Sequence, residues 1–337
     1  MPVNASNLIS VSVIVVSYNT SAVLRDCLLS LRREAPPDAE IIVVDNASDD
    51  GSPAMVQAEF PEVVVIETGR NLGFAGANNR GLAVSRGRRL LLLNSDTVVL
   101  PGALEAMAAF LDTNPKTGAV GCRLLNLDGS LQKSAYKFPS PARALAENLL
   151  LTAAFPNHPW VGDFRAWPHD RVRDVDFVIG AALMVRREVL DTVGGLDEGF
   201  FMYAEETDWC RRMREAGWAT TFLPHASVVH LGGGSSRAMP LRQFVESNRS
   251  ALRYIRKHHG PVGEGLYRAA MLLGAGVRLP LWGAAWLVLP GRRASIVPTL
   301  VLWRRLLRWY GGFGPHEGLR ELASAQSPAR VPRTETL

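Results

Sequence analysis

Short apolar runs alternate with helical patterns along the N-terminal part of the chain, and this alternation limits the fold more than any other feature. Residues 11–17 and 41–45 are β-branched runs without polar alternation, as in strands that are buried on both faces of a parallel sheet. Between them, apolar residues recur at helical spacing. The alternation continues with a strand at 63–67, a helix at 73–86 and a strand at 89–94. We therefore expect an α/β fold with a doubly wound sheet.

Polar residues follow three of these predicted strands, at residues 17–19, 45–46 and 94–96. Ligands of doubly wound sheets bind beyond the carboxyl ends of the strands, where such residues gather. Loops are polar in any case, so chance placement is the alternative interpretation. The strand ends are nevertheless the first place to look for a binding site.

Residues 70–79 (RNLGFAGANN) lie where a predicted strand passes into a helix. The free N–H groups of a helix start can receive a phosphate, and Arg70 can add a bidentate contact. Gly73 and Gly76 do not have the spacing of the dinucleotide fingerprint, and Walker-type phosphate loops are absent from the sequence. The segment therefore indicates phosphate binding of another kind.

Asp96 follows a strongly apolar run, so its carboxylate is expected to emerge at the edge of the sheet. Mg²⁺ or Mn²⁺ prefers oxygen ligands and commonly takes one or two carboxylates together with substrate phosphates. His230 ends the strand-like run 226–230 and can supply an imidazole to the same ion. The alternative is that His230 is a structural histidine.

Three carboxylates, Glu205, Glu206 and Asp208, fall within four positions. Like charges this close raise the pKa of one group unless a cation compensates, and such a group can serve as a general base. The alternative is an acidic first turn of the helix predicted at 206–216, which the helix dipole would favour.

Together these residues suggest transfer of a group from an activated donor, and they resemble the family 2 glycosyltransferases of the GT-A fold, in the rhamnosyltransferase-like branch. The GT-A fold is Rossmann-like, with a mostly parallel central sheet flanked by helices. The resemblance covers about residues 10–236. It rests on six motifs in the order of the family: 15–19 (VVSYN), 43–52 (VVDNASDDGS), 70–79 (RNLGFAGANN), 93–96 (LNSD), 194–201 (GGLDEGFF) and 205–209 (EETDW).

The resemblance implies a nucleotide-diphosphate sugar as donor and a divalent metal, Mg²⁺ or Mn²⁺. The metal ligands would be Asp96, at the last position of the family's DXD element, and His230. Asn94 and Ser95 replace acidic residues of that element, so one carboxylate remains there. The residues expected to bind the nucleotide sugar, with Tyr18 near the base, are Ser17, Tyr18, Asn19, Asp45, Arg70, Asn78, Asn94 and Ser95.

Position by position, the resemblance makes Glu206 the catalytic base, with Asp208 as the reserve candidate. Glu205 and Trp209 are expected to bind the acceptor. The implied reaction is a single in-line displacement with inversion at the anomeric carbon, in which Glu206 takes the proton of the acceptor hydroxyl.

A basic region follows the predicted catalytic domain. Residues 237–310 hold thirteen Arg or Lys against two Glu, so this stretch is +11 and the rest of the chain −6, within a net charge of +5. Its basic residues are interleaved with apolar and aromatic ones, which suits an anionic membrane surface better than nucleic acid. Residues 265–310 are interpreted as membrane-surface helices, with Trp282, Trp286, Trp303 and Trp309 near the headgroups. A basic subdomain packed on the catalytic core is the alternative.

The chain thus divides into a flexible N-terminus (1–9), a GT-A domain (10–236), a basic amphipathic helical extension that associates with membranes (237–314) and a loose tail (315–337). Residues 139–170 are expected to be irregular. Three scattered cysteines without metal-ligand spacing and the absence of a recognisable signal peptide favour the cytoplasm, with peripheral attachment to the cell membrane.

A glycan linked to polyprenyl diphosphate is the preferred acceptor, and rhamnose from dTDP-rhamnose is the first expectation for the donor. Galactofuranose or a hexose from a UDP-sugar is the next. Two functions of other classes stay open. A sugar nucleotidyltransferase would need a glycine- and arginine-rich phosphate loop after the first strand, which residues 17–20 do not provide. A non-catalytic, membrane-bound scaffold for polysaccharide assembly would not need the candidate catalytic residues.

Overall fold

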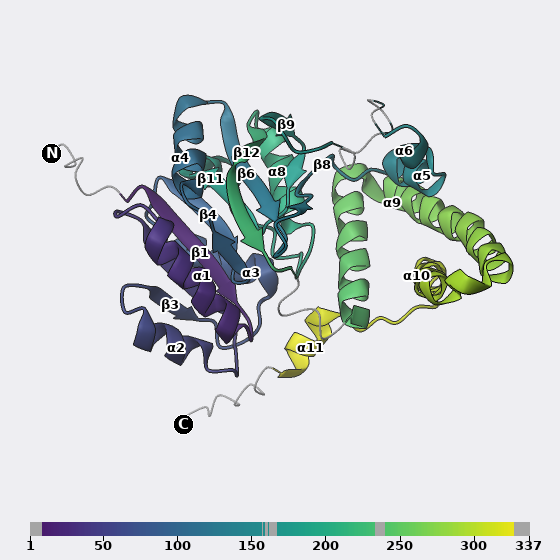
Figure 1. Ribbon diagram of the computed structural model, residues 1–337, viewed down its shortest axis with the longest axis horizontal. Helices are drawn as coiled ribbons and strands as arrows, with labels where there is room; N and C mark the ends of the chain where they lie inside the picture. Colours follow the sequence, from purple (N-terminus) through teal and green to yellow (C-terminus); the bar gives the residue numbers. More distant parts are fainter. Residues whose placement is uncertain (1–8, 157, 159–160, 162–166, 233–239, 327–337) are drawn as a thin grey trace, which may run out of the picture.

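A sheet domain and a long helical extension make up the molecule (Figure 1). The computed structural model describes residues 9–156, 158, 161, 167–232 and 240–326. Residues 1–8 of the predicted flexible N-terminus lie outside this part. Ile9 is ordered against the sheet domain, because its carbonyl oxygen accepts a hydrogen bond from the N–H of Arg88 at 3.1 Å.

The central sheet is mixed, with the order β3-β2-β1-β4-β11-β6-β12-β5. Its strands are β1 (Val11–Ser17), β2 (Glu40–Asp45), β3 (Val64–Glu67), β4 (Arg89–Asn94), β5 (Thr97–Val99), β6 (Thr117–Leu125), β11 (Ala182–Arg186) and β12 (Ala219–His230). The first four strands pair in parallel, as the sequence predicts. β11 runs antiparallel to β4 and β6, and β12 then pairs in parallel with β6.

Four short strands complete the sheets. β7 (Leu131–Gln132) pairs with β6, and β9 (Arg173–Val175) pairs with β12. β8 (Ala135–Tyr136) and β10 (Phe177–Val178) form a separate two-stranded sheet.

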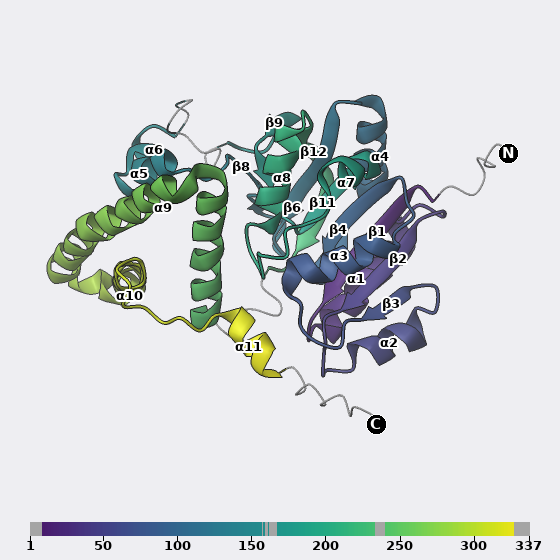
Figure 2. The same cartoon turned by 180° about the vertical axis from the view of Figure 1, so that it is seen from behind.

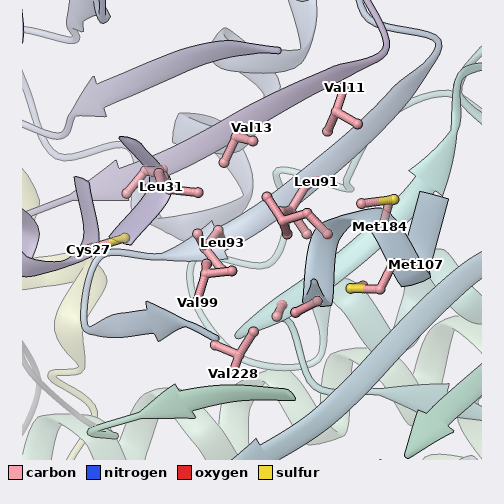
Figure 3. Close-up of a cluster of buried hydrophobic side chains, with 14 of the residues drawn as sticks. Val11, Val13, Cys27, Leu31, Leu91, Leu93, Val99, Met107, Met184 and Val228 are labelled. Atoms are coloured by element: carbon pink, nitrogen blue, oxygen red, sulfur yellow. The ribbon is translucent and has the colours of Figure 1, made fainter. Parts of the chain in front are cut away.

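Helices cover both faces of the central sheet. The helices around the sheet are α1 (Ser21–Glu34), α2 (Ser52–Glu59), α3 (Gly73–Val84), α4 (Ala103–Thr113), α7 (Arg187–Val193) and α8 (Glu205–Glu215). Two further helices, α5 (Pro141–Asn148) and α6 (Leu151–Ala154), lie beside the helical extension. Helices α1, α2 and α4 bury their apolar residues on one face, and α3, α7 and α8 on the other. Figure 3 shows the first of these cores, where Leu31 of α1 and Met107 of α4 lie over residues of β1, β4 and β11.

The prediction that residues 139–170 are irregular is wrong for their first part, which forms α5 and α6. Helix α5 begins at a proline, and the side chain of Ser140 accepts a hydrogen bond from the N–H of Arg143. Both features favour a helix start, and the high proline content of the segment concealed them.

The extension consists of α9 (Pro240–Val288), a short 3₁₀ turn (Pro290–Arg292), α10 (Arg293–Tyr310) and α11 (Leu319–Gln326). Figures 1 and 2 show α9 bent into two arms, with α10 in the opening between them and α11 beside the start of the first arm. The bend lies at Gly260, which has φ 69° and ψ −177°. Pro261 disfavours the helical conformation of the residue before it, and glycine adopts positive φ at low cost.

The prediction of a loose tail from residue 315 is wrong for α11, which is packed against the first arm of α9. Residues 327–337 of that tail lie outside the described part. Among the four tryptophans expected near the headgroups, Trp282 is exposed and the other three are partly buried. Trp286 and Trp303 lie under guanidinium groups, those of Arg293 and Arg278, each at 4.5 Å from the ring centroid.

Candidate active site

A cavity of about 370 Å³ opens at the carboxyl ends of β1 and β4, where the sequence predicts ligand binding. It also receives the start of α8, the end of β12 and parts of α9 and α11. The cavity brings together seven of the predicted site residues, which are Tyr18, Asn94, Ser95, Asp96, Glu205, Glu206 and His230. Residues more than two hundred positions apart in the chain therefore share one site.

Strained backbone precedes the two glutamates. Tyr203 and Ala204 have φ values of 72° and 65°, a region that residues with a Cβ rarely adopt. Such strain persists where the surrounding structure holds it, and it gathers at functional sites. Here the two residues turn the chain from the cavity wall into α8, which places Glu205 and Glu206 at the helix start beside the cavity.

Glu206 is the carboxylate best suited to accept a proton. Burial raises its pKa to about 7, although hydrogen bonds from backbone N–H groups, including that of Gly180, oppose this effect. Burial and the charge of Glu206 raise the pKa of Glu205 well above its ordinary value. A base with a pKa near neutrality combines a useful deprotonated fraction with good proton affinity. Oε2 of Glu205 is buried and accepts no hydrogen bond within the described part of the chain, so it can receive one from a ligand hydroxyl.

Asp208 does not line the cavity, which argues against its role as the reserve base. It lies two residues after Glu206, roughly 200° around the helix, and its side chain is fully buried. Its carboxylate accepts hydrogen bonds from Arg212 and His258 and forms an ion pair with Lys257 at 2.7 Å. Burial alone would raise the pKa of Asp208, but these three partners outweigh it and lower the pKa to about 2.

Trp209 does not line the cavity either, so the expectation that it binds the acceptor is wrong for this structure. Its side chain is 0% exposed and packs in the core between α8 and the sheet. The indole N–H donates a hydrogen bond to the carbonyl of Gly194 at 2.8 Å. The α8 start faces the cavity, whereas the following turn faces the core.

Asp96 and His230 form a pair that suits a metal ion. The imidazole Nε2 lies 3.4 Å from Oδ1 of Asp96, and both side chains are almost fully buried. Nδ1 donates to Oε1 of Gln132 at 2.6 Å, so in the neutral imidazole Nε2 carries a lone pair, which accepts a hydrogen bond from the Asn94 amide at 3.2 Å. A metal ion held by Nε2 and Asp96 would replace this hydrogen bond from Asn94, and a partner on the second nitrogen is typical of metal-binding histidines.

The protein supplies few ligands to this position. No group of three or more His, Cys, Asp or Glu that could hold a metal occurs among the described residues. Mg²⁺ and Mn²⁺ commonly complete their coordination with water and substrate phosphate oxygens. The donor set therefore fits a metal that binds together with a diphosphate.

The other residues predicted to contact the nucleotide do not line the cavity. Ser17 is buried and bonded to Thr20, and Asn78 is buried with its amide donating to the carbonyl of Phe74. Asn19 is exposed and its Oδ1 accepts from the N–H of Asp49, and Arg70 is also exposed.

Asp45 stands apart from these residues. Its Oδ2 accepts from the N–H of Ser48, but its buried Oδ1 accepts no hydrogen bond from any residue that the structure describes. An unused acceptor at a strand end is available to a ligand.

Two asparagines that lie in the predicted motifs but were not among the predicted ligand contacts line the cavity, Asn46 and Asn71. The Asn46 amide donates to Oδ1 of Asn71 at 2.9 Å and accepts from the N–H of Leu72 at 2.8 Å. Asn46 follows Asp45 and Asn71 follows Arg70, both predicted to contact the nucleotide. Their place beside these residues was the signal by which the sequence could have identified them. The cavity residues of the extension, which are Gln243, Leu319 and Ala323, have no such signal.

Gly73 links the loop that carries Asn71 to the segment before α8. The N–H of Phe74 donates to the carbonyl of Phe201 at 2.7 Å, and a Cβ at Gly73 would collide with that carbonyl. Gly73 also has φ 74°, so both space and conformation require glycine here.

Residues 12–194 match the model of the family described as Glycosyl transferase family 2, which is more than half of the chain. The chain belongs to this family. It is a glycosyltransferase, and its similarity to relatives extends beyond the family model. An N-acetylglucosaminyl-diphospho-decaprenol L-rhamnosyltransferase of Mycobacterium tuberculosis is 29% identical over 274 residues, which cover 77% of this chain and 87% of that protein. A low-salt glycan biosynthesis hexosyltransferase, Agl10 of Haloferax volcanii, is 26% identical over 63% of this chain and 64% of its own.

Solved structures agree with the fold of this family 2 glycosyltransferase. The mannosyltransferase PcManGT from Pyrobaculum calidifontis, solved in complex with GDP-Man and Mn²⁺, matches with a TM-score of 0.53 at 20% identity, over 88% of this chain and 85% of its own. GalNAc-T7, solved with UDP, GalNAc and Mn²⁺, matches with a TM-score of 0.54 at 16% identity, over 75% and 48%. The predicted GT-A fold is thereby confirmed.

Proposed function

We propose that this glycosyltransferase moves a sugar from a nucleotide diphosphate to a glycan linked to polyprenyl diphosphate, with inversion at the anomeric carbon. The observation that carries the proposal is the position of Glu206. A buried carboxylate with a pKa near 7 lines the same cavity as Asp96 and His230, the candidate metal ligands, and a set of polar strand ends. A base for the acceptor hydroxyl, a cation for the leaving group and polar groups for the nucleotide, together in one cavity, support an inverting transfer.

In the proposed reaction the acceptor hydroxyl oxygen forms a bond to the anomeric carbon while the bond from that carbon to the diphosphate oxygen breaks. Glu206 takes the hydroxyl proton, and the nucleoside diphosphate leaves. Glu205 receives a hydrogen bond from the acceptor through its unused oxygen. Asp96 and His230 would hold a divalent ion, Mg²⁺ or Mn²⁺, which neutralises charge on the leaving diphosphate.

The nucleotide binds at the N-terminal half of the sheet in this proposal. Tyr18 lines the cavity and would lie next to the nucleobase. Asp45 offers its unused Oδ1 to the nucleobase or the ribose. Asn46 and Asn71 add amide groups that the sequence analysis did not include. Arg70 is exposed outside the cavity and would reach the phosphates only after a movement of its side chain.

Rhamnose from dTDP-rhamnose remains the first expectation for the donor, because a relative that is similar over most of its length is a rhamnosyltransferase. Its printed acceptor, a decaprenol linked through diphosphate to N-acetylglucosamine, supports the choice of a lipid-linked acceptor. The hexosyltransferase relative keeps a hexose donor as the alternative.

We also propose that the extension attaches the enzyme peripherally to the cytoplasmic face of the membrane. Helix α9 is the one helix in the described ranges that is long and apolar enough to cross a bilayer. Its second arm is instead bound along its side by α5, because Arg278 donates to Oδ1 of Asn148 and to the carbonyl of Glu147. A spanning arm would draw α5 into the lipid with it. Exposed apolar residues of the second arm and α10 that can enter the interface include Val262, Leu266, Leu273, Leu281, Trp282, Leu287, Val288, Val297, Val301 and Leu302.

Replacement of the base tests the proposed function. Glu206→Gln keeps the size and hydrogen-bonding capacity of the side chain but cannot accept the acceptor proton. With Mn²⁺ and a panel of nucleotide sugars, we expect turnover to fall by about 10²–10⁴-fold while the thermal shift caused by the donor is retained. Loss of donor binding would place Glu206 in the donor site instead. A wild-type enzyme that neither transfers nor hydrolyses any donor would favour the scaffold function.

A further inference from the structure

Helix α11 reaches the cavity although it begins more than a hundred residues after the predicted base. Leu319 and Ala323, four residues apart and therefore on one face of the helix, line the cavity. A role of α11 in acceptor binding rests on the proposed function, because it needs a sugar acceptor in this cavity.

Specific contacts hold α11 in place. Arg249 of α9 donates to the carbonyl of His316 at 2.6 Å and forms an ion pair with Glu321 at 3.0 Å. Arg320 donates to the carbonyl of Gly199 at 2.6 Å, which ties α11 to the segment that leads into α8. The N–H of Gly318 is satisfied by Glu321 at 2.6 Å, so the start of α11 is capped.

A buried acid on α9 adds to this attachment. The side chain of Glu246 is 1% exposed, and its Oε2 forms an ion pair with Arg249 at 3.1 Å. The same oxygen lies 3.4 Å from the N–H of Arg320. The Arg249 side chain is 32% exposed, so the cost of separating this pair falls on Glu246, whose buried carboxylate would lose its cation. Helix α11 is therefore a built wall of the cavity.

The two ends of the cavity differ in chemistry. At the strand ends it is lined by polar groups such as Asn46, Asn71 and Asp96, which suit a ribose and a diphosphate. At α11 it is lined by Leu319, Ala323 and Phe201, whose ring lies 5.9 Å from the Arg320 guanidinium of α11, and Gln243 of α9 supplies an amide to the lining. An apolar wall with one amide suits the C–H face of a sugar ring and not a diphosphate.

We propose that α11 is part of the acceptor site, where Leu319 and Ala323 contact the sugar that carries the attacking hydroxyl. The acceptor then lies between α11 and the glutamates of α8, opposite the donor. Shape at positions 319 and 323 selects among acceptor sugars and leaves donor binding unchanged.

The experiment compares two substitutions on neighbouring positions of α11. Ala323→Trp fills the cavity from its wall, whereas Ser324→Trp adds the same side chain on the exposed side of the helix. The full-length enzyme is assayed with Mn²⁺, the nucleotide sugar that is active with the wild type, and a short-chain N-acetylglucosaminyl-diphospho-prenol. We measure the KM for this acceptor, kcat, and the Kd for the nucleotide sugar.

We expect Ala323→Trp to raise the acceptor KM by at least about ten-fold, because the indole occupies the space of the acceptor sugar. This rise corresponds to about 1.4 kcal/mol of acceptor binding free energy, and the donor Kd should stay unchanged. Ser324→Trp should match the wild type in both. If Ala323→Trp does not fold, Leu319→Ala provides the same comparison, with a smaller rise in acceptor KM.

Three results would overturn this inference. The first is an acceptor KM of Ala323→Trp equal to that of Ser324→Trp, and the second is a donor Kd that rises together with the acceptor KM. The third is an increase in turnover at unchanged acceptor KM after removal of residues 315–337, as expected of an inhibitory segment. Failure of the proposed function looks different, because the wild type itself would then show no transfer to the acceptor, and the inference would fall with it.

Discussion

Asp208→Asn should destabilise the protein without removing the catalytic base. The carboxylate is fully buried and satisfies Arg212, Lys257 and His258, the last two on α9. Its pKa is lowered from 3.8 to about 2, and each pKa unit corresponds to about 1.4 kcal/mol, so the charged partners stabilise the fold by about 2 kcal/mol. The substitution keeps the shape but removes the charge, which leaves three cations or donors facing a neutral amide.

The assay is thermal unfolding of both proteins at pH 7, with and without nucleotide sugar. The unfolding entropy is about 2.1 cal/mol/K per residue, so in this chain of 337 residues a loss of about 2 kcal/mol should lower the melting temperature by roughly 3 °C. Glu215→Gln on the same helix is the matched control. Its ion pair with Arg211 has the glutamate side chain 53% exposed, and exposed pairs contribute at most about 1 kcal/mol.

The pH dependence has a definite sign. Because the folded pKa of Asp208 lies below its unfolded value, the stabilisation is fully present above pH 3.8 and is lost as the pH falls through about 2. The difference between the wild type and Asp208→Asn should therefore be constant from pH 7 to about 5 and shrink only in stronger acid. The reasoning would be refuted if Asp208→Asn abolished turnover at an unchanged melting temperature, since Asp208 would then be the base.

Three further predictions concern the cavity and the extension. Because the pKa of Glu206 is raised to about 7, the base is lost on protonation, and kcat/KM should fall about ten-fold per pH unit below 7; a flat profile from pH 5.5 to 8 would exclude it as the base. Gln132→Leu removes the acceptor that orients His230, so the Mn²⁺ concentration for half-maximal activity should rise at least about ten-fold in a metal titration; an unchanged value would remove the imidazole from the metal site. Leu281→Glu should reduce flotation with anionic vesicles, whereas Leu127→Glu, at a 76% exposed position of the sheet domain, should not; equal flotation of the two would argue against a membrane surface on α9.

The sequence by itself determined the sheet domain and the general place of the site. The apolar runs of β1, β2 and β4 have no polar alternation, and such runs are stable only when both faces are covered. Parallel strands place their carboxyl ends on one edge, so the polar residues after β1 and β4 had to gather there. Local patterns also indicated α8 with its acidic start. These inferences succeeded because they depend on periodicity and on contacts between neighbouring elements.

The tertiary structure supplied the physical reason why Glu206, and not the reserve candidate Asp208, is available for chemistry. The resemblance ranked the two carboxylates, but only the structure shows that α8 turns Glu206 toward the cavity and Asp208 toward α9, whose Lys257 and His258 neutralise it. The same packing placed Trp209 in the core. Neither outcome can be read from the motif itself, because the position of α9 supplies the cations around Asp208 and the packing of α8 on the sheet buries Trp209.

The extension shows the same limit most clearly. The polar, proline-containing C-terminal stretch has no pattern that predicts a role at the cavity, yet Leu319 and Ala323 complete its wall. Their position follows from the bend at Gly260, the course of α10 and the ion pairs of Arg249, which bring the end of the chain back to the site. Local sequence specifies a helix or a strand, whereas contacts between distant segments depend on how all the intervening elements pack.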